Sequence, residues 1–395
     1  MTKVVPECGS GGGKLFDEQS NSTQRFFDTL EAFSAAYGKV HHNISLFICV
    51  FGVMANVLHI TILTRPIMKR SAVNRLLAFM AIFDTITMVD YLLYLICFGL
   101  FIDSSTPPFG YQYLWICYLL AHVVLSISLH SISMYLSVAT AFIRLIAISR
   151  IQSKMMRPQM ASRICIVISL LMAILIVPTF YVHQIVESVT PGEFKVALPQ
   201  ENDIRCQIFI LNLWLTGMFF KVIPCLLLMV FTVSLLYKLH LNKIAHEKIA
   251  SKQAYQSRSA QSDRTTMLLI LLLVIFTTTE MPQGLLALLN ALYTEDVNRY
   301  LYSHLGDFFD LLSLINGSMC FVLYPCISTQ YRQTFSVLFA RLRNNYWGPY
   351  KSTSFSSRFP GTISECRSID TTEYFGPSLP IGHQYRFVEY DEVNL

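Results

Sequence analysis

Long apolar segments alternate with short polar segments along most of the chain. The apolar runs cover approximately residues 43–64, 75–101, 113–148, 161–183, 208–238, 265–292 and 303–326. A helix needs about 20 apolar residues to cross the hydrocarbon core of a bilayer, and each run supplies them. Prolines within the runs are compatible with helices, because neighbouring helices satisfy the carbonyl groups that a proline kink frees. The pattern predicts an all-α membrane protein in which residues 43–326 form a seven-transmembrane-helix bundle.

The segments outside this bundle are polar. Residues 1–42 are rich in glycine and predict a flexible extracellular tail, with a glycosylation sequon at Asn21. Residues 327–343 have apolar side chains at helical spacing, which predicts an amphipathic, short cytoplasmic surface helix on the inner leaflet. Residues 344–395 are rich in Ser, Thr, Gly and Pro and predict a disordered cytoplasmic tail that can be phosphorylated.

Basic residues orient the chain in the membrane. The loops after the first, third and fifth runs hold many lysines and arginines, whereas the other three loops hold only Lys195, Arg205 and Arg299. Positively charged loops stay in the cytoplasm, so we expect a multi-pass plasma membrane protein with its N-terminus outside the cell. Charged residues make up 14% of the chain, against about 25% in soluble domains. The net charge of +5 reflects this topology rather than binding to nucleic acid.

Cysteine positions give little sign of a disulfide framework. Most of the 10 cysteines lie within or at the ends of apolar runs, where a free cysteine acts as a small hydrophobic residue. Cys117 and Cys206 are both expected on the oxidising outer side of the membrane. We therefore predict a disulfide between them.

Polar positions inside the runs point to a family. With the topology, Asn56 in the first run, Asp84 in the second and Arg144 at the end of the third resemble motifs of rhodopsin-like (class A) G-protein-coupled receptors. An ionisable residue as deep in a run as Asp84 is costly and indicates a functional site. The resemblance implies an allosteric sodium ion at Asp84, Ser133, Asn316 and Asn56, and no other cofactor. The alternative is a structural polar cluster that water satisfies.

The cytoplasmic side departs from that family at two positions. The resemblance implies that Arg144 contacts a G protein, but Ile143 stands where the family has an acidic partner for this arginine. Asp263 is the candidate substitute, and the alternative is that Arg144 reaches lipid phosphates. In the seventh run Cys320 stands at the family's asparagine, while Tyr324 remains as a candidate switch.

The sixth run carries the most specific motif. Residues 277–284 have the sequence Thr-Thr-Thr-Glu-Met-Pro-Gln-Gly, with Glu280 where rhodopsin-like receptors have a tryptophan. The motif closely resembles invertebrate myosuppressin and FMRFamide-type neuropeptide receptors, in particular the nematode dromyosuppressin-receptor-related group, and the likeness covers roughly residues 43–343. It implies an amidated peptide ligand, inhibitory (Gi/o) heterotrimeric G proteins, and arrestin and receptor kinases at the tail. Pro282 is then the candidate pivot of the helix movement on activation.

A receptor for a peptide ending in Arg-Phe-amide needs three kinds of group. A carboxylate binds the guanidinium, aromatic rings surround the phenylalanine, and polar groups bind the amide. The candidates for ligand binding are Asp90, Glu280, Tyr91, Tyr94, His122, Gln283, Asp307 and Asp310. Our hypothesis is that Asp90 or Glu280 pairs with the peptide arginine, because a carboxylate in a membrane helix is energetically costly and indicates a functional role. For any single aromatic or histidine, helix packing is the alternative role.

Two other classes of protein share this topology. A chemosensory receptor for a small molecule would not need an acidic mouth, and a transporter or channel would show internal repeats and paired broken helices. We find no such repeats, and no nucleophile elbow, P-loop or His-Glu-x-x-His motif, so we do not expect an enzyme. The expected partners are an amidated peptide, a G protein and membrane lipids.

Overall fold

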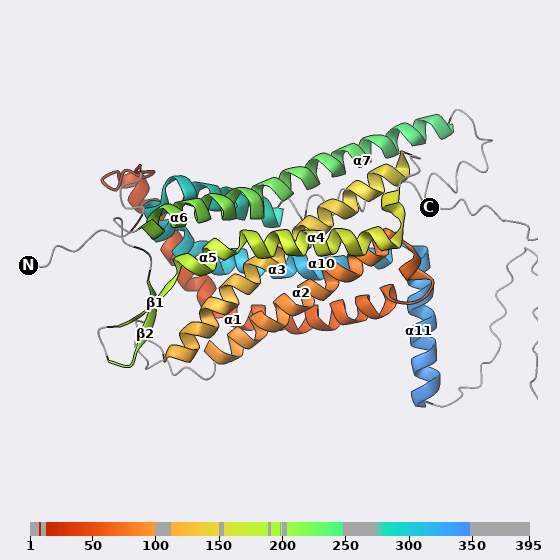
Figure 1. The fold of residues 1–395 in the computed structure, drawn as a ribbon, viewed down its shortest axis with the longest axis horizontal. Coiled ribbons are helices and arrows are strands. Elements are labelled where there is room, and N and C mark those ends of the chain that lie inside the picture. The colour runs from red at the N-terminus through yellow and green to blue at the C-terminus, as the bar shows by residue number, and fades with distance from the viewer. Residues whose placement is uncertain are drawn as a thin grey trace, which may run out of the picture. The chain divides into compact units, whose positions relative to one another are not determined.

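Figure 1 shows the computed structural model of the chain. It describes residues 8, 13–98, 112–149, 154–188, 191–197, 199, 204–247, 275 and 278–347. The chain forms two compact units, Met1–Leu338 and Phe339–Leu395. All contacts discussed below lie within the first unit.

Helices make up most of the described chain. In chain order they are α1 (Asn21–Leu63), α2 (Ala72–Ile96), α3 (Tyr113–Ile148), α4 (Pro158–Leu175), α5 (Val177–Val182), α6 (Ile204–Trp214), α7 (Ile223–Glu247), α9 (Thr294–Asp296), α10 (Ser303–Ile327) and α11 (Thr329–Trp347). Two π-helical segments, η4 (Leu215–Val222) and η5 (Val297–Tyr302), join α6 to α7 and α9 to α10. Residues 278–292 are also helical. Short 3-10 turns are η1 (Met68–Arg70) and η3 (Lys154–Met156).

The membrane segments agree with the apolar runs. Among the described residues, 6 helices are long and apolar enough to cross a membrane. Residues 278–292 belong to the run predicted as the sixth crossing, of which only residue 275 is otherwise described. The fold is therefore an all-α seven-helix bundle, as predicted.

The surface of α4 fits a lipid environment. Ile166, Val167, Leu170 and Ile174 are each more than half exposed, at 58%, 64%, 61% and 68%. A contiguous apolar surface of this kind is unusual on a soluble monomer and normal on a helix that faces lipid.

Three features differ from the sequence predictions. Helix α1 begins at Asn21, so residues 21–42 are helical and the prediction of a flexible tail up to residue 42 is wrong. The apolar residues that this N-terminal part packs on the start of the seventh helix give the physical reason. An antiparallel hairpin of β1 (Gln184–Glu187) and β2 (Phe194–Ala197) follows α5 and was not predicted. The surface helix continues to Trp347, four residues past the predicted end; the predicted disordered tail beyond it lies outside the described residues.

The first unit has two ends that are useful as landmarks. The β1–β2 hairpin lies beside α5 and α6 at one end, and α11 begins at the other (Figure 1). We call these the hairpin end and the α11 end.

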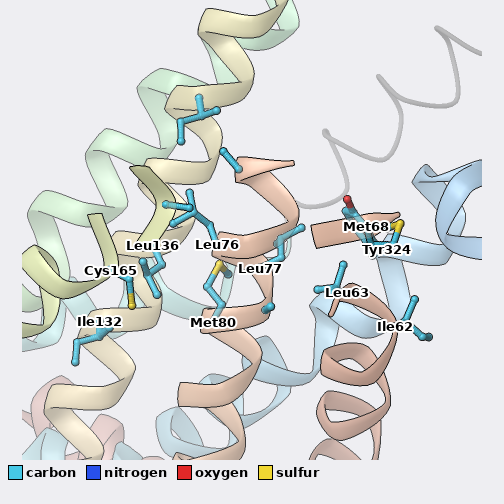
Figure 2. Close-up of a cluster of buried hydrophobic side chains, with 14 of the residues drawn as sticks. Ile62, Leu63, Met68, Leu76, Leu77, Met80, Ile132, Leu136, Cys165 and Tyr324 are labelled. Atoms are coloured by element: carbon cyan, nitrogen blue, oxygen red, sulfur yellow. The ribbon is translucent and has the colours of Figure 1, made fainter. Parts of the chain in front are cut away.

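The main hydrophobic core lies toward the α11 end (Figure 2). Side chains of α2 occupy its centre, with α3 on one side and α1 on the other. The labelled members are Ile62, Leu63, Met68, Leu76, Leu77, Met80, Ile132, Leu136, Cys165 and Tyr324. This core fixes the first four helices around α2, which leaves the space between α3, η4 and α10 for polar groups.

Glycine permits a close approach of α1 to its neighbours. A Cβ atom at Gly52 would collide with the Met88 side chain of α2 and would lie 3.0 Å from Oγ of Ser318 on α10. Small residues at membrane helix interfaces allow this kind of packing. Gly38 on the same helix has no atom within 4 Å of the corresponding position.

The N-terminal segment folds back over the hairpin end. Cys8 forms a disulfide with Cys206 of α6, and its amide donates to the Pro199 carbonyl over 3.0 Å. Cys8 is buried there with Val182 and Phe209. Cys117 is a free cysteine, so the predicted Cys117–Cys206 pairing is wrong. The physical reason is that a segment beyond the seven runs, with its own buried contacts, brings Cys8 to Cys206.

A carboxylate at the start of the seventh helix also holds this segment. Oδ2 of Asp296 accepts hydrogen bonds from the amides of Leu15 and Phe16, over 2.6 Å and 3.2 Å. The Phe16 ring packs edge-on against Phe27 at 5.1 Å, and Phe27 stacks on Tyr300 at 4.1 Å. The N-terminal segment is therefore attached to both the fifth and the seventh helix.

Gly52→Ala should destabilise the protein by about 1–3 kcal/mol, because the new methyl group overpacks the contact of α1 with Met88. Gly38→Ala is the matched control and should be neutral or slightly stabilising, since alanine suits a helix better than glycine. Thermal unfolding of the detergent-purified protein measures both. Equal melting temperatures for the two variants would contradict the proposed contact.

Cys8→Ser should leave Cys206 as a reactive thiol, whereas Cys117→Ser should leave the 8–206 disulfide intact. Loss of a native disulfide costs about 2–4 kcal/mol, so only Cys8→Ser should lower the melting temperature clearly. Peptide mapping under non-reducing conditions identifies the linked cysteines. A peptide that links Cys117 to Cys206 would refute the assignment.

Candidate functional site

A buried carboxylate lies at the centre of the bundle. Glu280 is 0% exposed, and its Oε2 atom lies 3.0 Å from Nε2 of His130 and 3.3 Å from Nζ of Lys221. Its Oε1 atom accepts a hydrogen bond from Nδ2 of Asn316 over 3.0 Å. A buried charge needs a partner and hydrogen bonds. Glu280 has both, from the third, fifth and seventh helices.

Local backbone features bring Lys221 to this carboxylate. Lys221 lies in the π-helical segment η4, a geometry that often occurs at functional sites. A Cβ atom at Gly217 of that segment would lie 3.1 Å from the Ala287 carbonyl, and one at Gly284 would lie 3.6 Å from Cβ of Lys221. Two glycines thus let the fifth helix approach residues 278–292 closely.

Lys221 also binds the residue after the proline. Its Nζ atom lies 2.6 Å from Oε1 of Gln283, which also accepts a hydrogen bond from Ser313 over 3.1 Å. Lys221 was missed by the sequence analysis, because it lies within an apolar run and outside the loops that we compared. A lysine inside a membrane segment is itself a signal of function and could have identified it.

A cavity of about 290 Å³ opens on the hairpin side of Glu280. Its lining includes Tyr91, His122, Lys221, Gln283, Asp310 and Ser313. Asp310 is exposed in this cavity, and among the described residues its carboxylate has no hydrogen bond or ion pair. It is therefore the carboxylate best placed to receive a cation.

Asp90 is buried and already has a partner. Its Oδ2 atom lies 2.7 Å from Nδ1 of His122. The His122 ring stacks on Tyr94 at 4.6 Å, and the Tyr91 hydroxyl lies 3.2 Å from Nε2 of His41. These residues form a continuous aromatic wall, which supports the packing alternative for Tyr94 and leaves His122 and Tyr91 facing the cavity.

The hypothesis that Asp90 or Glu280 binds a peptide arginine is not supported by this geometry. Both carboxylates already have partners within the bundle, and a ligand would have to displace these partners. Asp307 is exposed one turn away from Asp310 but does not line the cavity. Of the four predicted carboxylates, only Asp310 both lines the cavity and is unpaired in the part of the chain that the structure describes.

The predicted sodium cluster is only partly assembled. Oδ1 of Asp84 accepts a hydrogen bond from Ser133 over 2.6 Å. Asn316 instead donates to Glu280, and Asn56 donates to the Gly317 carbonyl over 3.2 Å. Oδ1 of Asn56 is buried and has no hydrogen-bond partner among the described residues. The oxygen atoms of Asp84 and Ser133 fit a hard cation, since such ions prefer oxygen ligands.

A second cavity, of about 140 Å³, extends toward the α11 end. Asp84, His130 and Gly317 line both cavities, so the two are separated by a thin polar layer. Arg144, Cys320 and Tyr324 line the second one. The surfaces expected to meet a ligand and a G protein are thus connected through the same residues.

The Tyr324 hydroxyl connects three helices. It donates to Oδ1 of Asn74 on α2 and interacts with Arg144 on α3. Asp263, the predicted partner of Arg144, lies outside the described residues. Pro282 lies within helical residues 278–292, two residues after Glu280, which is compatible with a role as a pivot.

Helix α11 is fastened to the bundle by a buried aromatic pair. Tyr331 is 0% exposed and its hydroxyl lies 3.0 Å from Nδ1 of His59 on α1. Burial, and then the neighbouring Tyr324, raise the pKa of Tyr331. This contact could not be predicted from the sequence, because His59 and Tyr331 lie far apart in the chain.

Known proteins match most of this chain. A family model described as serpentine type 7TM GPCR chemoreceptor Srw matches residues 43–341. The G-protein coupled receptor dmsr-1 of Caenorhabditis elegans is 30% identical over 352 residues, which cover 77% of this chain and 68% of that receptor. The family match includes every residue that lines the two cavities.

Proposed function

Because the chain belongs to the Srw family of serpentine seven-transmembrane G-protein-coupled receptors, we propose that it is a receptor for a cationic, C-terminally amidated neuropeptide. The resemblance to FMRFamide-type and myosuppressin receptors supports this ligand class, and so does the similarity to dmsr-1. As a member of that family the chain is a membrane receptor and not an enzyme.

The unpaired carboxylate of Asp310 is the observation that carries the proposal. It lies in a cavity of about 290 Å³, at the small end of the range of ligand pockets. A volume of this size suits the last one or two residues of a peptide. The Asp310 carboxylate binds the guanidinium, Tyr91 and His122 contact the terminal phenylalanine, and polar groups near Gln283 bind the amide.

In this proposal the hairpin end faces the outside of the cell. The low number of basic residues in the loops at that end supports this orientation. The sequon at Asn21, the first residue of α1, is then accessible to glycosylation. The disulfide between Cys8 and Cys206 also suits an oxidising compartment.

Signalling passes to a G protein at the α11 end. Peptide binding favours a state in which the sixth helix moves about Pro282 and opens the cavity at Arg144. Gi/o coupling, arrestin and receptor kinases are further parts of the proposal, and they rest on the family resemblance. A sodium ion at Asp84 and Ser133 would stabilise the resting state.

A chemosensory receptor for a small molecule is the second candidate. The description of the family as chemoreceptors and the modest size of the cavity favour it. A small amine would also use Asp310. Such a receptor would respond to low-molecular-weight cations and would not respond to Arg-Phe-amide peptides at any concentration.

Asp310→Asn should reduce the potency of a peptide ending in Arg-Phe-amide by about 10- to 100-fold, because a charge-assisted contact is worth about 1.5–3 kcal/mol. Replacing the peptide arginine by neutral citrulline should cause a similar loss on the wild-type receptor and little further loss on Asp310→Asn. Concentration–response curves for cAMP measure all four combinations.

Glu295→Gln is the matched control for this charge. Glu295 is an exposed carboxylate near the start of the seventh helix and does not line the cavity. Its neutralisation should leave the effect of citrulline unchanged. If citrulline costs as much potency on Asp310→Asn as on the wild type, Asp310 is not the partner of the arginine.

Arg144→Ala should abolish the peptide-dependent fall in cAMP while peptide binding at the cell surface persists. Arg163→Ala, an exposed arginine on α4, is the control and should signal normally. Pertussis toxin, which inactivates Gi/o proteins, should block the wild-type response. A normal response of Arg144→Ala would place the G-protein contact elsewhere.

A further inference from the structure

The charge of Lys221 faces the ligand cavity, while its counter-charge lies behind it. Lys221 lines the cavity and its side chain is 13% exposed, whereas Glu280 is fully buried and does not line it. The pair Lys221–Glu280 is neutral as a unit. A ligand therefore meets a lysine whose positive charge is already compensated.

The hydrogen-bonding capacity of Lys221 is not exhausted. An ammonium group has three N–H donors. One faces Glu280 over 3.3 Å and one faces Gln283 over 2.6 Å, which leaves one for a ligand. Oε1 of Gln283 already accepts from both Lys221 and Ser313. Lys221 is a stronger donor for a ligand carbonyl than a neutral amide N–H, because its donor group is charged.

Apart from His122 and His130, which contact Asp90 and Glu280, the other titratable groups of the cavity are acidic. Asp310 and Asp84 line it, and Glu280 lies directly behind Lys221. When Asp310 binds the peptide arginine, a ligand group next to Lys221 lies near two further carboxylates, Asp84 and Glu280, and one compensated lysine. A neutral carbonyl can accept the free N–H of Lys221 there, whereas a carboxylate would be repelled by the surrounding negative charge.

We propose that Glu280 makes the receptor selective for a C-terminal carboxamide over a free C-terminal carboxylate, by neutralising Lys221 from behind. The inference rests on the proposed peptide function and adds a specificity-determining residue to it. The selectivity is a difference of two affinities, and the buried carboxylate provides the repulsive part.

The experiment compares one peptide in two forms, ending in Arg-Phe-amide and in Arg-Phe with a free carboxylate. Both are tested on cells that express the full-length receptor, and the ratio of their half-maximal concentrations is recorded. The wild type should prefer the amide. Glu280→Gln keeps the side-chain size and leaves Lys221 uncompensated, so the ratio should move toward the free acid by about tenfold or more, about 1.4 kcal/mol.

The double variant Lys221→Met/Glu280→Gln removes both charges. It should regain the preference for the amide, because no uncompensated lysine attracts a carboxylate there and Asp84 still repels it. Lys221→Met alone leaves Glu280 with His130 and Asn316 but without its lysine, and should increase the preference further. Surface biotinylation measures whether Glu280→Gln reaches the cell surface. If it does not, the peptide ratio of Lys221→Met tests the proposal instead.

Several results would overturn the proposal. One is that surface-expressed Glu280→Gln has the same ratio of half-maximal concentrations as the wild type. Another is that Glu280→Gln responds to neither peptide. A third is an unchanged ratio in Lys221→Met, and a fourth is a double variant that prefers the acid as strongly as Glu280→Gln. Glu295→Gln controls for net charge at the same end, and an equal shift there would also refute the role of Glu280. If the wild-type receptor responds to neither peptide, the proposed function itself is contradicted, and so is this inference.

Discussion

The ionic contact around Glu280 is the constraint on which the rest of the bundle depends. A carboxylate without exposure, inside a protein that spans a bilayer, is tolerated only with partners at hydrogen-bond distance. His130, Lys221 and Asn316 meet that need from three different helices. Their geometry fixes how α3, η4 and α10 are rotated toward residues 278–292. The cavity lined by Asp310 lies on one side of this contact, and the cavity lined by Arg144 lies on the other.

Much of the fold could be predicted from apolar length and loop charge, because these respond to the bilayer itself. The positions of costly polar residues such as Asp84, Asp90 and Glu280 could be predicted for the same reason. Their partners could not, since pairing depends on how distant helices are rotated. The partner of Cys206 was predicted wrongly for a similar reason. The Cys8–Cys206 disulfide depends on contacts between the N-terminal segment and the bundle, whereas a glycine-rich composition predicts a flexible segment without such contacts. Asp310 was one candidate among four until the structure showed that Asp90 and Glu280 are already paired.

The structure shows which side chain contacts Arg144 at the α11 end, which the sequence alone does not. Ile143 offers no charge to Arg144, and Cys320 stands at the family's asparagine. In the structure the hydroxyl of Tyr324 contacts Asn74 and Arg144, and Pro325 follows it directly within α10. A tyrosine thus takes part of the role expected of an acid. The rings of His59, Tyr324 and Tyr331 then connect this point to α1 and α11.

Because of the π-helical segment η4, the number of residues in the fifth membrane helix determines the direction in which Lys221 points. A π turn holds more residues than an α turn, so the faces of the helix before and after it are out of phase. Asn212, before the segment, bonds Thr179 of α5, while Lys221, near its end, bonds Glu280. Inserting or deleting one residue between them would rotate Lys221 by about 100° and turn its charge toward lipid. Related chains can therefore vary in the length of their loops, but those that keep this ion pair must conserve the residue count between positions 212 and 221.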